Sequence, residues 1–227
     1  MKSFLFKILN WVGVFILRKS ITDKKFCIIS NDCYGGELYR WLKLPYNTPF
    51  IGLMIMIPCY LKLIQNLKEY LSYPLVFINL SKYDEMIIFR QQNNFYPIAL
   101  LNDVEIHFLH YDSQQEALNT WNKRIKRINY NNLYFKISID KDYGEKVHLQ
   151  EFELLPFKNK LSVSNMQYNF SSINHKIPNN VLDATVTFRL SLKYINIIGW
   201  LNRKGTNFHN LYEHFIGHIL FFTLRRR

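Results

Sequence analysis

The chain has 227 residues, which is enough for one large domain or two small ones with a substantial core. Hydrophobic residues make up 48% of it and aromatic residues 16%, and no proline-rich, serine-rich or repeated stretch occurs, which argues against disorder and against a solenoid. Lys and Arg number 29 against 17 Asp and Glu, and the resulting formal charge of +12 favours an anionic or phosphorylated partner or an anionic membrane surface.

The first predicted element is an apolar helix at the N-terminus. Residues 4–17 are almost all apolar, and basic residues flank them. A helix of this length reaches roughly 21 Å at 1.5 Å per residue, short of the ~30 Å hydrocarbon core, so we expect it to lie in the membrane interface. The run ends at Arg18-Lys19 without a small-residue cleavage site, which argues against a signal peptide. A helix packed on the protein's own core fits the sequence equally well.

The next segment predicts a strand, a glycine turn and a helix. Residues 25–30 have the composition of a buried strand, residues 31–36 contain a pair of glycines, and residues 37–42 are compatible with a helix. Further along, the pattern predicts helices at 60–71 and 113–129, strands at 75–79, 86–90, 97–101, 104–109, 133–139 and 161–164, and a mainly helical segment after residue 180. The best marked start is the S-x-x-E capping box at the beginning of the second of these helices.

Strands that alternate with helices predict a three-layer α/β fold. Some neighbouring strands have connections too short for a crossover, so we expect the central sheet to be mixed. We divide the chain into a membrane-surface amphipathic helix at 1–20 and a single α/β domain at 21–227. The helical C-terminal segment ends in three arginines at 225–227, which offer a second contact to anionic lipid. Ligands of open α/β sheets sit beyond the carboxyl ends of the strands, where two polar loops at 31–36 and 110–112 are expected to converge.

The loop at 31–36 is the first candidate for binding chemistry. Asn31 offers a donor and an acceptor, Asp32 a carboxylate and Cys33 a thiol, while Gly35 and Gly36 let a ligand approach the backbone. The start of the following helix would favour a phosphate there. The loop has neither a Walker nor a dinucleotide fingerprint, and a tight turn capped by Asn31 or Asp32 explains the same residues.

Titratable residues gather in the run E-I-H-F-L-H-Y. Glu105 and His107 share one face of their predicted strand, and His110 lies beyond its end. His110 is the preferred general base because histidine titrates near neutral pH, and Asp32 would assist it. His107 fits a core histidine paired with Glu105 equally well. Arg124 lies closest to the apolar stripe of its helix, from where its guanidinium can bind a phosphate or a carboxylate.

Cysteine spacing and charge distribution narrow the classes of partner. The chain has three cysteines without CxxC spacing, which argues against a disulfide framework and a structural zinc site and favours a reducing cytoplasm. Cys33 as a nucleophile competes with Cys33 as a small core residue. The basic residues are dispersed, without a zinc-finger or RNA-recognition pattern, so we expect no nucleic-acid partner. We also expect no metal and no cofactor, since His214 and His218 lack an evident third ligand.

Five ordered blocks of the chain resemble one family. The blocks read ISNDCYGGELYR, LPYNTPFIGL, YPIALLNDVEIHFLHY, EALNTWNKRIKRIN and LPFKNKL, and they fall between residues 26 and 161. They are similar to the domain of unknown function 1919 family, which is often labelled exopolysaccharide biosynthesis protein. The resemblance implies an α/β fold and a setting among genes for capsule, exopolysaccharide or lipopolysaccharide assembly, without settled catalytic residues. The blocks contain the loop residues chosen above and also Asn47.

Three functions remain open on these features. The first is a peripheral transferase at the cytoplasmic face of the membrane, which modifies or extends a glycan precursor with an activated, nucleotide- or lipid-linked donor. In it His110 and Asp32 would deprotonate the acceptor hydroxyl. The substrate would be bound by Asn31, Cys33, Gly35, Gly36, Asn47, Glu105 and Arg124. The second is a non-catalytic glycan-binding or assembly component of the same machinery, and the third is a hydrolase with Cys33 as its nucleophile.

Overall fold

The structure is a computed structural model that describes residues 2–92, 95–178 and 183–224. Its ten helices and two β-sheets within those residues confirm the α/β class. The three terminal arginines, an expected contact to anionic lipid, lie outside the described residues.

Four strands form a parallel sheet in the order β1-β5-β6-β7. They are β1 (Cys27–Ser30), β5 (Leu133–Ser138), β6 (Lys160–Ser164) and β7 (Asn174–Lys176). β1 and β5 are almost continuous runs of buried residues, which is the pattern of a strand covered on both faces. Ser30 of β1 lies opposite Lys136 of β5, so the carboxyl ends of the two strands are aligned.

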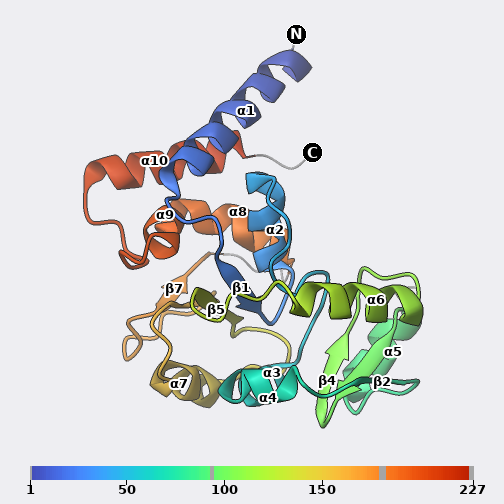
Figure 1. The fold of residues 1–227 in the computed structure, drawn as a ribbon. Helices are drawn as coiled ribbons and strands as arrows, with labels where there is room; N and C mark the ends of the chain where they lie inside the picture. Colours follow the sequence, from blue (N-terminus) through green and yellow to red (C-terminus); the bar gives the residue numbers. More distant parts are fainter. Residues whose placement is uncertain (1, 93–94, 179–182, 225–227) are drawn as a thin grey trace.

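Helices cover both faces of this parallel sheet, which gives the expected three layers (Figure 1). The first layer consists of α2 (Tyr34–Leu42), α8 (Ala184–Tyr194) and α9 (Ile197–Leu201), and the opposite layer of α3 (Ile57–Gln65), α4 (Leu67–Tyr70) and α7 (Lys146–Leu154). Ile28 and Tyr134 point into the core beneath the first layer, while Ile29 and Phe135 point into the core beneath the second. This alternation is what the period of a β-strand requires.

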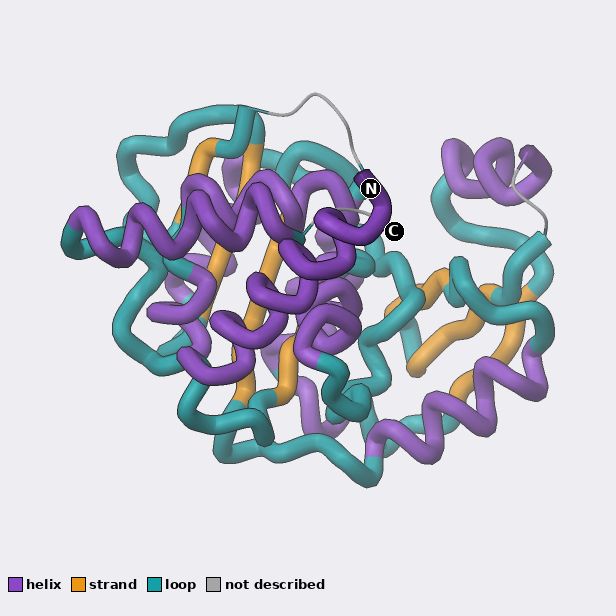
Figure 2. The backbone as a smooth tube through the Cα atoms, turned by 90° about the horizontal axis from the view of Figure 1, so that it is seen from above, coloured by secondary structure: helices purple, strands orange, loops and turns teal. Residues whose placement is uncertain are grey.

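The remaining strands form a separate antiparallel sheet rather than joining a single mixed one. Its strands are β2 (Leu75–Ile78), β3 (Ile98–Leu101) and β4 (Val104–His107), in that order. The turn between β3 and β4 is too short for a crossover, and Asn102 takes the left-handed conformation there, with a φ of 57°. The antiparallel sheet lies beside the parallel one with α5 (Asp84–Gln92) and α6 (Gln114–Ile125), as Figure 2 shows. The segment 51–55 links the two sheets: Met54 pairs with His107, and the Ile55 amide donates to the carbonyl of Asn31.

Several predicted elements differ in type or length. The strand expected at 86–90 lies within helix α5, whose first turn contains Asp84 and Glu85, two residues that favour a helix start. The helix expected at 60–71 begins earlier, at Ile57, and is divided at Asn66 into α3 and α4. The helix expected at 113–129 ends at Ile125. Helix α7 and strand β7 have no counterpart among the predicted elements.

Helices α1 (Lys2–Ser20) and α10 (Leu211–Thr223) form an outer layer on top of α8 and α9 (Figure 1). They cross where Gly13 of α1 lies against Thr223 of α10, so closely that a Cβ atom at Gly13 would overlap the threonine side chain. The amino-terminal half of α1 projects beyond the body of the protein (Figure 1). None of the described helices combines the length and the apolar character needed to cross a bilayer.

Candidate functional site

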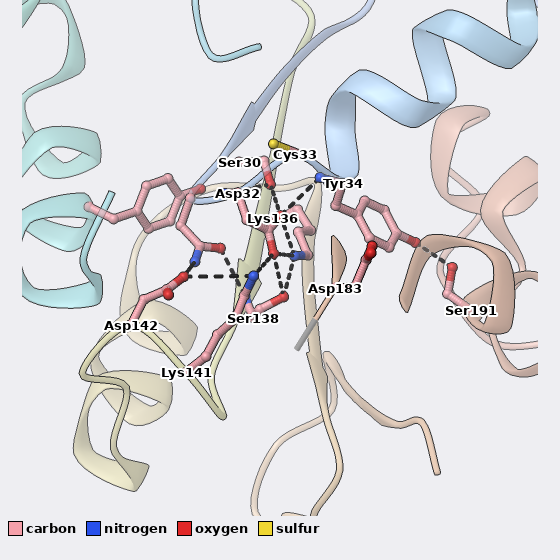
Figure 3. A network of polar contacts seen from close by, with 12 residues as sticks. Ser30, Asp32, Cys33, Tyr34, Lys136, Ser138, Lys141, Asp142, Asp183 and Ser191 are labelled. Carbon is pink, nitrogen blue, oxygen red and sulfur yellow. Dashed lines mark hydrogen bonds and ion pairs between the residues drawn. The ribbon is translucent and has the colours of Figure 1, made fainter. Parts of the chain in front are cut away.

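The strongest candidate site lies where β1 and β5 end side by side. The loop after β1 contributes Asn31 and Asp32, and the loop after β5 contributes Lys141 and Asp142. Figure 3 shows the side chains of Lys141 and of Lys136, which belongs to β5 itself, converging on Asp32, with Asp142 beside Lys141. Polar side chains at the carboxyl ends of adjacent parallel strands occupy the position at which open α/β sheets bind ligands.

Asp32 and Lys136 form a buried ion pair at the centre of this site. The Lys136 ammonium lies 2.8 Å from each carboxylate oxygen of Asp32, and the two side chains are 0% and 3% exposed. Asp32 also accepts hydrogen bonds from the hydroxyls of Ser138 and Ser30, at 2.9 and 3.0 Å, and from the backbone amide of Tyr34 at 3.0 Å. A buried charge is tolerated when it is paired and its remaining bonds are satisfied, as they are here.

The hydroxyl of Ser138 connects the two charges. It accepts a hydrogen bond from the Lys136 ammonium and donates one to the Asp32 carboxylate. On the opposite side, the ring of Tyr34 lies 4.7 Å from the Lys136 nitrogen, and the phenol of Tyr34 is 2.6 Å from the hydroxyl of Ser191 on α8. The lysine is therefore held between β1, β5 and the first helical layer.

A second ion pair extends the site toward the surface. The Lys141 ammonium lies 3.1 Å from Asp32 and 3.8 Å from Asp142, and its side chain is 13% exposed. The side-chain amide of Asn31 donates to Asp142 at 3.2 Å, and its oxygen accepts from the backbone amide of Ser138 at 2.9 Å. We call these six residues, Asn31, Asp32, Lys136, Ser138, Lys141 and Asp142, the carboxyl-edge cluster.

The backbone of the β5 loop is strained where it enters the cluster. Asp142 and Tyr143 have φ angles of 56° and 62°, a left-handed conformation that non-glycine residues rarely adopt and that costs of order 1–3 kcal/mol each. The carbonyl of Asp142 accepts a bond from the amide of Ile57, which fixes the loop to the start of α3. Strain of this kind is concentrated at functional sites, where the surrounding structure holds it in place.

Burial and neighbouring charges shift the pKa values of the cluster in different directions. Burial would raise the pKa of Asp32, but the ammonium groups of Lys136 and Lys141 outweigh it and hold that pKa well below its usual range. Burial lowers the pKa of Lys136 to about 8, although Asp32 opposes this shift. For Lys141 burial acts in the same direction, but Asp32 and Asp142 outweigh it and raise the pKa. Burial raises the pKa of Asp142 to about 6. Lys136 and Asp142 are therefore the members able to exchange protons near neutral pH.

The first glycine of the loop after β1 has a packing role. Gly35 and Gly36 lie in the first turn of α2 rather than in a turn before it. A Cβ atom at Gly35 would lie 2.9 Å from the side chain of Ile28, so glycine lets the helix pack closely on β1. Two glycines are compatible with a helix start, which is why the pattern resembled a phosphate-binding turn.

Cys33 is poorly suited to act as a nucleophile. Burial, assisted by the charge of Asp32, raises the pKa of its thiol to about 12. Its sulfur lies 3.8 Å from the carbonyl of Leu53. Because the thiolate is the nucleophilic form, the hydrolase hypothesis loses its catalytic residue.

The sequence predicts that His110 and Asp32 share one site, but the structure separates them. The side chain of His110 is exposed, and its backbone amide donates to the carbonyl of Gly52 at 3.2 Å. The amide of Ile55, three residues after Gly52, donates to the carbonyl of Asn31. The segment 51–55 therefore lies between the loop that contains Asp32 and the loop that contains His110. Among the described residues the hydrogen bonds of the Asp32 carboxylate come from the carboxyl-edge cluster, Ser30 and Tyr34, and none comes from His110.

Glu105 and His107 form the core pair that the sequence left open as an alternative. The Nε2 atom of His107 lies 2.7 Å from Glu105, its Nδ1 atom lies 3.1 Å from the phenol of Tyr96, and both members of the pair are fully buried. Glu105 also accepts bonds from the hydroxyl of Ser81 and from the amide of Lys82. These contacts engage both residues inside the antiparallel sheet.

Arg124 and Asn47 lie near the segment 51–55. The guanidinium of Arg124 donates to the phenol of Tyr111 at 2.8 Å and lies 4.8 Å from the centre of the Tyr46 ring. The carbonyl of Asn47 accepts a bond from the thiol of Cys27, and its side chain is half-buried. Of the sequence-predicted site residues, the structure thus brings together Asn31 and Asp32, with Cys33 beside them, and places the others outside the carboxyl-edge cluster.

The sequence reasoning missed four members of the cluster, namely Lys136, Ser138, Lys141 and Asp142. Two features of the sequence nevertheless point to this region. A lysine inside the apolar strand LYFKIS is unusual, because a central strand buries every side chain. Residues 140–142 read Asp-Lys-Asp, which is the Asp-x-Asp spacing of common sugar-nucleotide transferases. The two carboxylates have different partners, since Asp140 accepts a bond from the amide of Asn165 while Asp142 belongs to the cluster. The described residues contain no group of three His, Cys, Asp or Glu side chains placed to hold a metal ion.

Comparison with known proteins assigns a family. The model of the family described as domain of unknown function (DUF1919) matches residues 7–202. A Haemophilus influenzae protein named "Uncharacterized protein" is 34% identical over 152 residues, which cover 67% of this chain and 68% of that protein. The family match extends from α1 to the end of α9 and includes both loops of the carboxyl-edge cluster. The chain therefore belongs to the domain of unknown function 1919 family.

Proposed function

We propose that the protein is a transferase of bacterial surface-polysaccharide synthesis, which acts on a hydroxyl group of a glycan precursor at the cytoplasmic face of the membrane. The observation that carries the proposal is Lys136, buried between Asp32 and Ser138 at the carboxyl edge of the parallel sheet, with a pKa lowered to about 8. A general base works best when its pKa lies near the operating pH. The precursor, nucleotide- or lipid-linked, suits the net charge of +12.

In this proposal Lys136 is the base and Ser138 its relay. The neutral amine, about a tenth of the molecules one pH unit below its pKa, takes the proton of the Ser138 hydroxyl. Ser138 in turn takes the proton of the acceptor hydroxyl, whose oxygen then forms the bond to the transferred group as the donor's leaving group departs. Asp32 stays ionised and stabilises the ammonium that forms. Lys141, the partly exposed cation of the cluster, is placed to contact an anionic donor.

Replacing Ser138 with alanine tests this assignment. We expect transfer from a nucleotide-sugar or lipid-linked donor, assayed with and without Mg²⁺ or Mn²⁺, to fall about 100-fold, as when one proton-transfer group is removed. The matched control is Ser164→Ala, which removes a buried hydroxyl at the end of the neighbouring strand β6. Unchanged surface polysaccharide in cells that carry folded S138A protein would contradict the mechanism.

A non-catalytic glycan-binding or assembly role is the alternative, and one observation favours it. Lys136 has no exposed surface and Ser138 is itself buried, so the two proposed proton-transfer groups offer little surface to a substrate. If the cluster merely holds the two loops in place, S138A and a Lys141→Ala variant should change the polysaccharide only in proportion to their loss of folded protein. Thermal unfolding measured beside the polysaccharide yield separates the two roles.

The outer face of α1 supports the membrane location. Phe4, Ile8, Trp11 and Phe15 follow one another at helical spacing, and each is between 43% and 70% exposed. The opposite face is buried at Leu17, so α1 packs on the protein and offers an apolar stripe to the outside at the same time. The basic residues Lys7, Arg18 and Lys19 border this stripe, which is the arrangement of a helix that lies in an anionic membrane interface.

Removing two members of the stripe should weaken membrane binding. We expect the W11S/F15S variant to bind vesicles of phosphatidylglycerol and phosphatidylcholine at least tenfold more weakly, because each large apolar side chain contributes roughly 1.5–3 kcal/mol when buried. Flotation of vesicles with bound protein measures this. The control variant is V76S/I88S, which makes the same kind of change at two exposed residues, one in β2 and one in α5. Equal binding by both variants would contradict the proposed location.

A further inference from the structure

A cavity lies beneath α10, apart from the carboxyl-edge cluster. It has a volume of about 260 Å³ and is enclosed by α8, α9 and α10, with Ser20 at the end of α1 in its wall. Its apolar lining includes Leu192, Ile195, Ile198, Ile216 and Leu220. The apolar part of this lining would accept a hydrocarbon chain, because it offers dispersion contacts to it.

The polar residues around the cavity fall into two groups. Asn196, Asn202 and Glu213 are hydrogen-bonded within the protein: the side chain of Asn196 donates to the carboxylate of Glu213 at 3.1 Å, and that of Asn202 donates to the carbonyl of Ser20 at 2.7 Å. These bonds hold the walls together without a ligand. Lys204 and Tyr212 are exposed at the rim, and Tyr212 is 71% exposed. The rim thus offers an ammonium and a phenol to a polar head, and an ammonium favours an anionic one.

The rim continues into a second apolar surface. Leu211, Phe215 and Phe222 are each more than half exposed and recur at helical spacing along α10. Because α10 crosses α1 at Gly13, this surface and the stripe of α1 belong to the same outer layer of the protein. A lipid whose head lies at Lys204 would therefore come from the bilayer on which α1 is proposed to lie.

We propose that the cavity binds one acyl chain of an anionic glycerophospholipid, with its phosphate at Lys204 and Tyr212. The proposal rests on the membrane location proposed above. A single apolar contact gives marginal and reversible membrane binding, whereas two contacts give stable anchoring. The α1 stripe and a lipid drawn into the cavity provide those two contacts.

The test uses the full chain and a soluble probe, lauroyl-lysophosphatidylglycerol below its micelle concentration. In titration calorimetry we expect saturable binding of this probe, at least several-fold weaker binding of the zwitterionic lauroyl-lysophosphatidylcholine, and no binding of glycerophosphoglycerol, which lacks the chain. Lys204→Glu should weaken binding of the anionic probe about tenfold. Lys126→Glu, the same change on the exposed surface of the distant C-cap of α6, should leave it unchanged. Ile198→Phe, which fills the cavity from its half-buried wall, should abolish binding of both lysolipids.

Three results would overturn the inference: no saturable binding, equal affinity for both headgroups, or affinity unaffected by both K204E and I198F. Because the probe is soluble, the W11S/F15S variant should still bind it. Binding of the probe without vesicle flotation would therefore contradict the membrane location and support the lipid site in the cavity. Flotation without probe binding would support the membrane location and contradict the lipid site. A failure of the S138A test would contradict neither the membrane location nor the lipid site in the cavity.

Discussion

Replacing Asp32 with alanine is expected to lower the free energy of unfolding by about 3–5 kcal/mol, the usual loss when one partner of a buried ion pair is removed. The variant leaves the Lys136 ammonium fully buried without its carboxylate, and it leaves Ser30, Ser138 and the amide of Tyr34 without their acceptor. Chemical denaturation at pH 7 measures the change. The control is Asp112→Ala, which removes an exposed carboxylate and should change stability by less than about 0.5 kcal/mol.

A double variant shows how much of this loss belongs to the pair itself. D32N/K136M removes both charges and keeps side chains of similar size. We expect it to be less destabilised than the sum of D32N and K136M, because neither charge is then left alone in the core. Additive effects would mean that Asp32 and Lys136 are not coupled. A loss below about 1 kcal/mol in D32A would mean that the site is open to water.

The same measurements separate a functional cluster from a structural one. Active sites retain groups that are unfavourable for stability, so a catalytic Asp32–Lys136 pair should be replaceable, as a pair, by uncharged residues with little loss of stability and complete loss of transfer. If D32N/K136M is at least as stable as the native protein and inactive, the pair exists for its chemistry. If it is unstable and the remaining folded fraction is active, the pair exists for the fold.

The sequence predicted the edge at which the site lies better than the residues that form it. Buried strands at 25–30 and 133–139 were identifiable because runs of apolar residues mark covered parallel strands, and the rule that ligands lie beyond their carboxyl ends selected Asn31 and Asp32. Which strand lies next to β1 is a long-range property that no local pattern contains. The polar loops favour the strand before His110 as the partner of β1, whereas β5 occupies that place.

The errors at individual residues have local physical causes. Gly35 resembles part of a phosphate-binding turn because a helix that packs closely on a strand needs the same residue type. Lys136 was overlooked because a lysine in an apolar run is ordinarily read as an edge residue, and only its pairing with Asp32 allows it to be central. The pairs Glu105–His107 and Arg124–Tyr111 show the opposite case, in which reactive side chains serve the core.

The contribution of Asp142 to stability should fall as the pH rises from about 4 to 6. Burial raises the pKa of this carboxyl to about 6 in the folded protein, against about 3.9 in an unfolded chain. Over that range the folded state binds the proton more tightly than the unfolded state, so folding is favoured at the acid end. The difference of about 2 pKa units corresponds to about 3 kcal/mol. Asp32 acts in the opposite direction, but its pKa lies so low that its contribution is lost only at more acid pH.

Asp142→Asn isolates this contribution. Asparagine tolerates the left-handed φ of 56° and can still accept the bond from Asn31, so the substitution removes the titration without adding strain. As the pH rises from 4 to 7, D142N should gain about 2 kcal/mol of stability relative to the native protein, as measured by denaturation at each pH. A difference that does not vary with pH would mean that Lys141 keeps Asp142 ionised throughout. A carboxylate retained in a strained, buried position at this cost is what a site kept for binding or proton transfer requires, and asparagine would serve a purely structural loop as well.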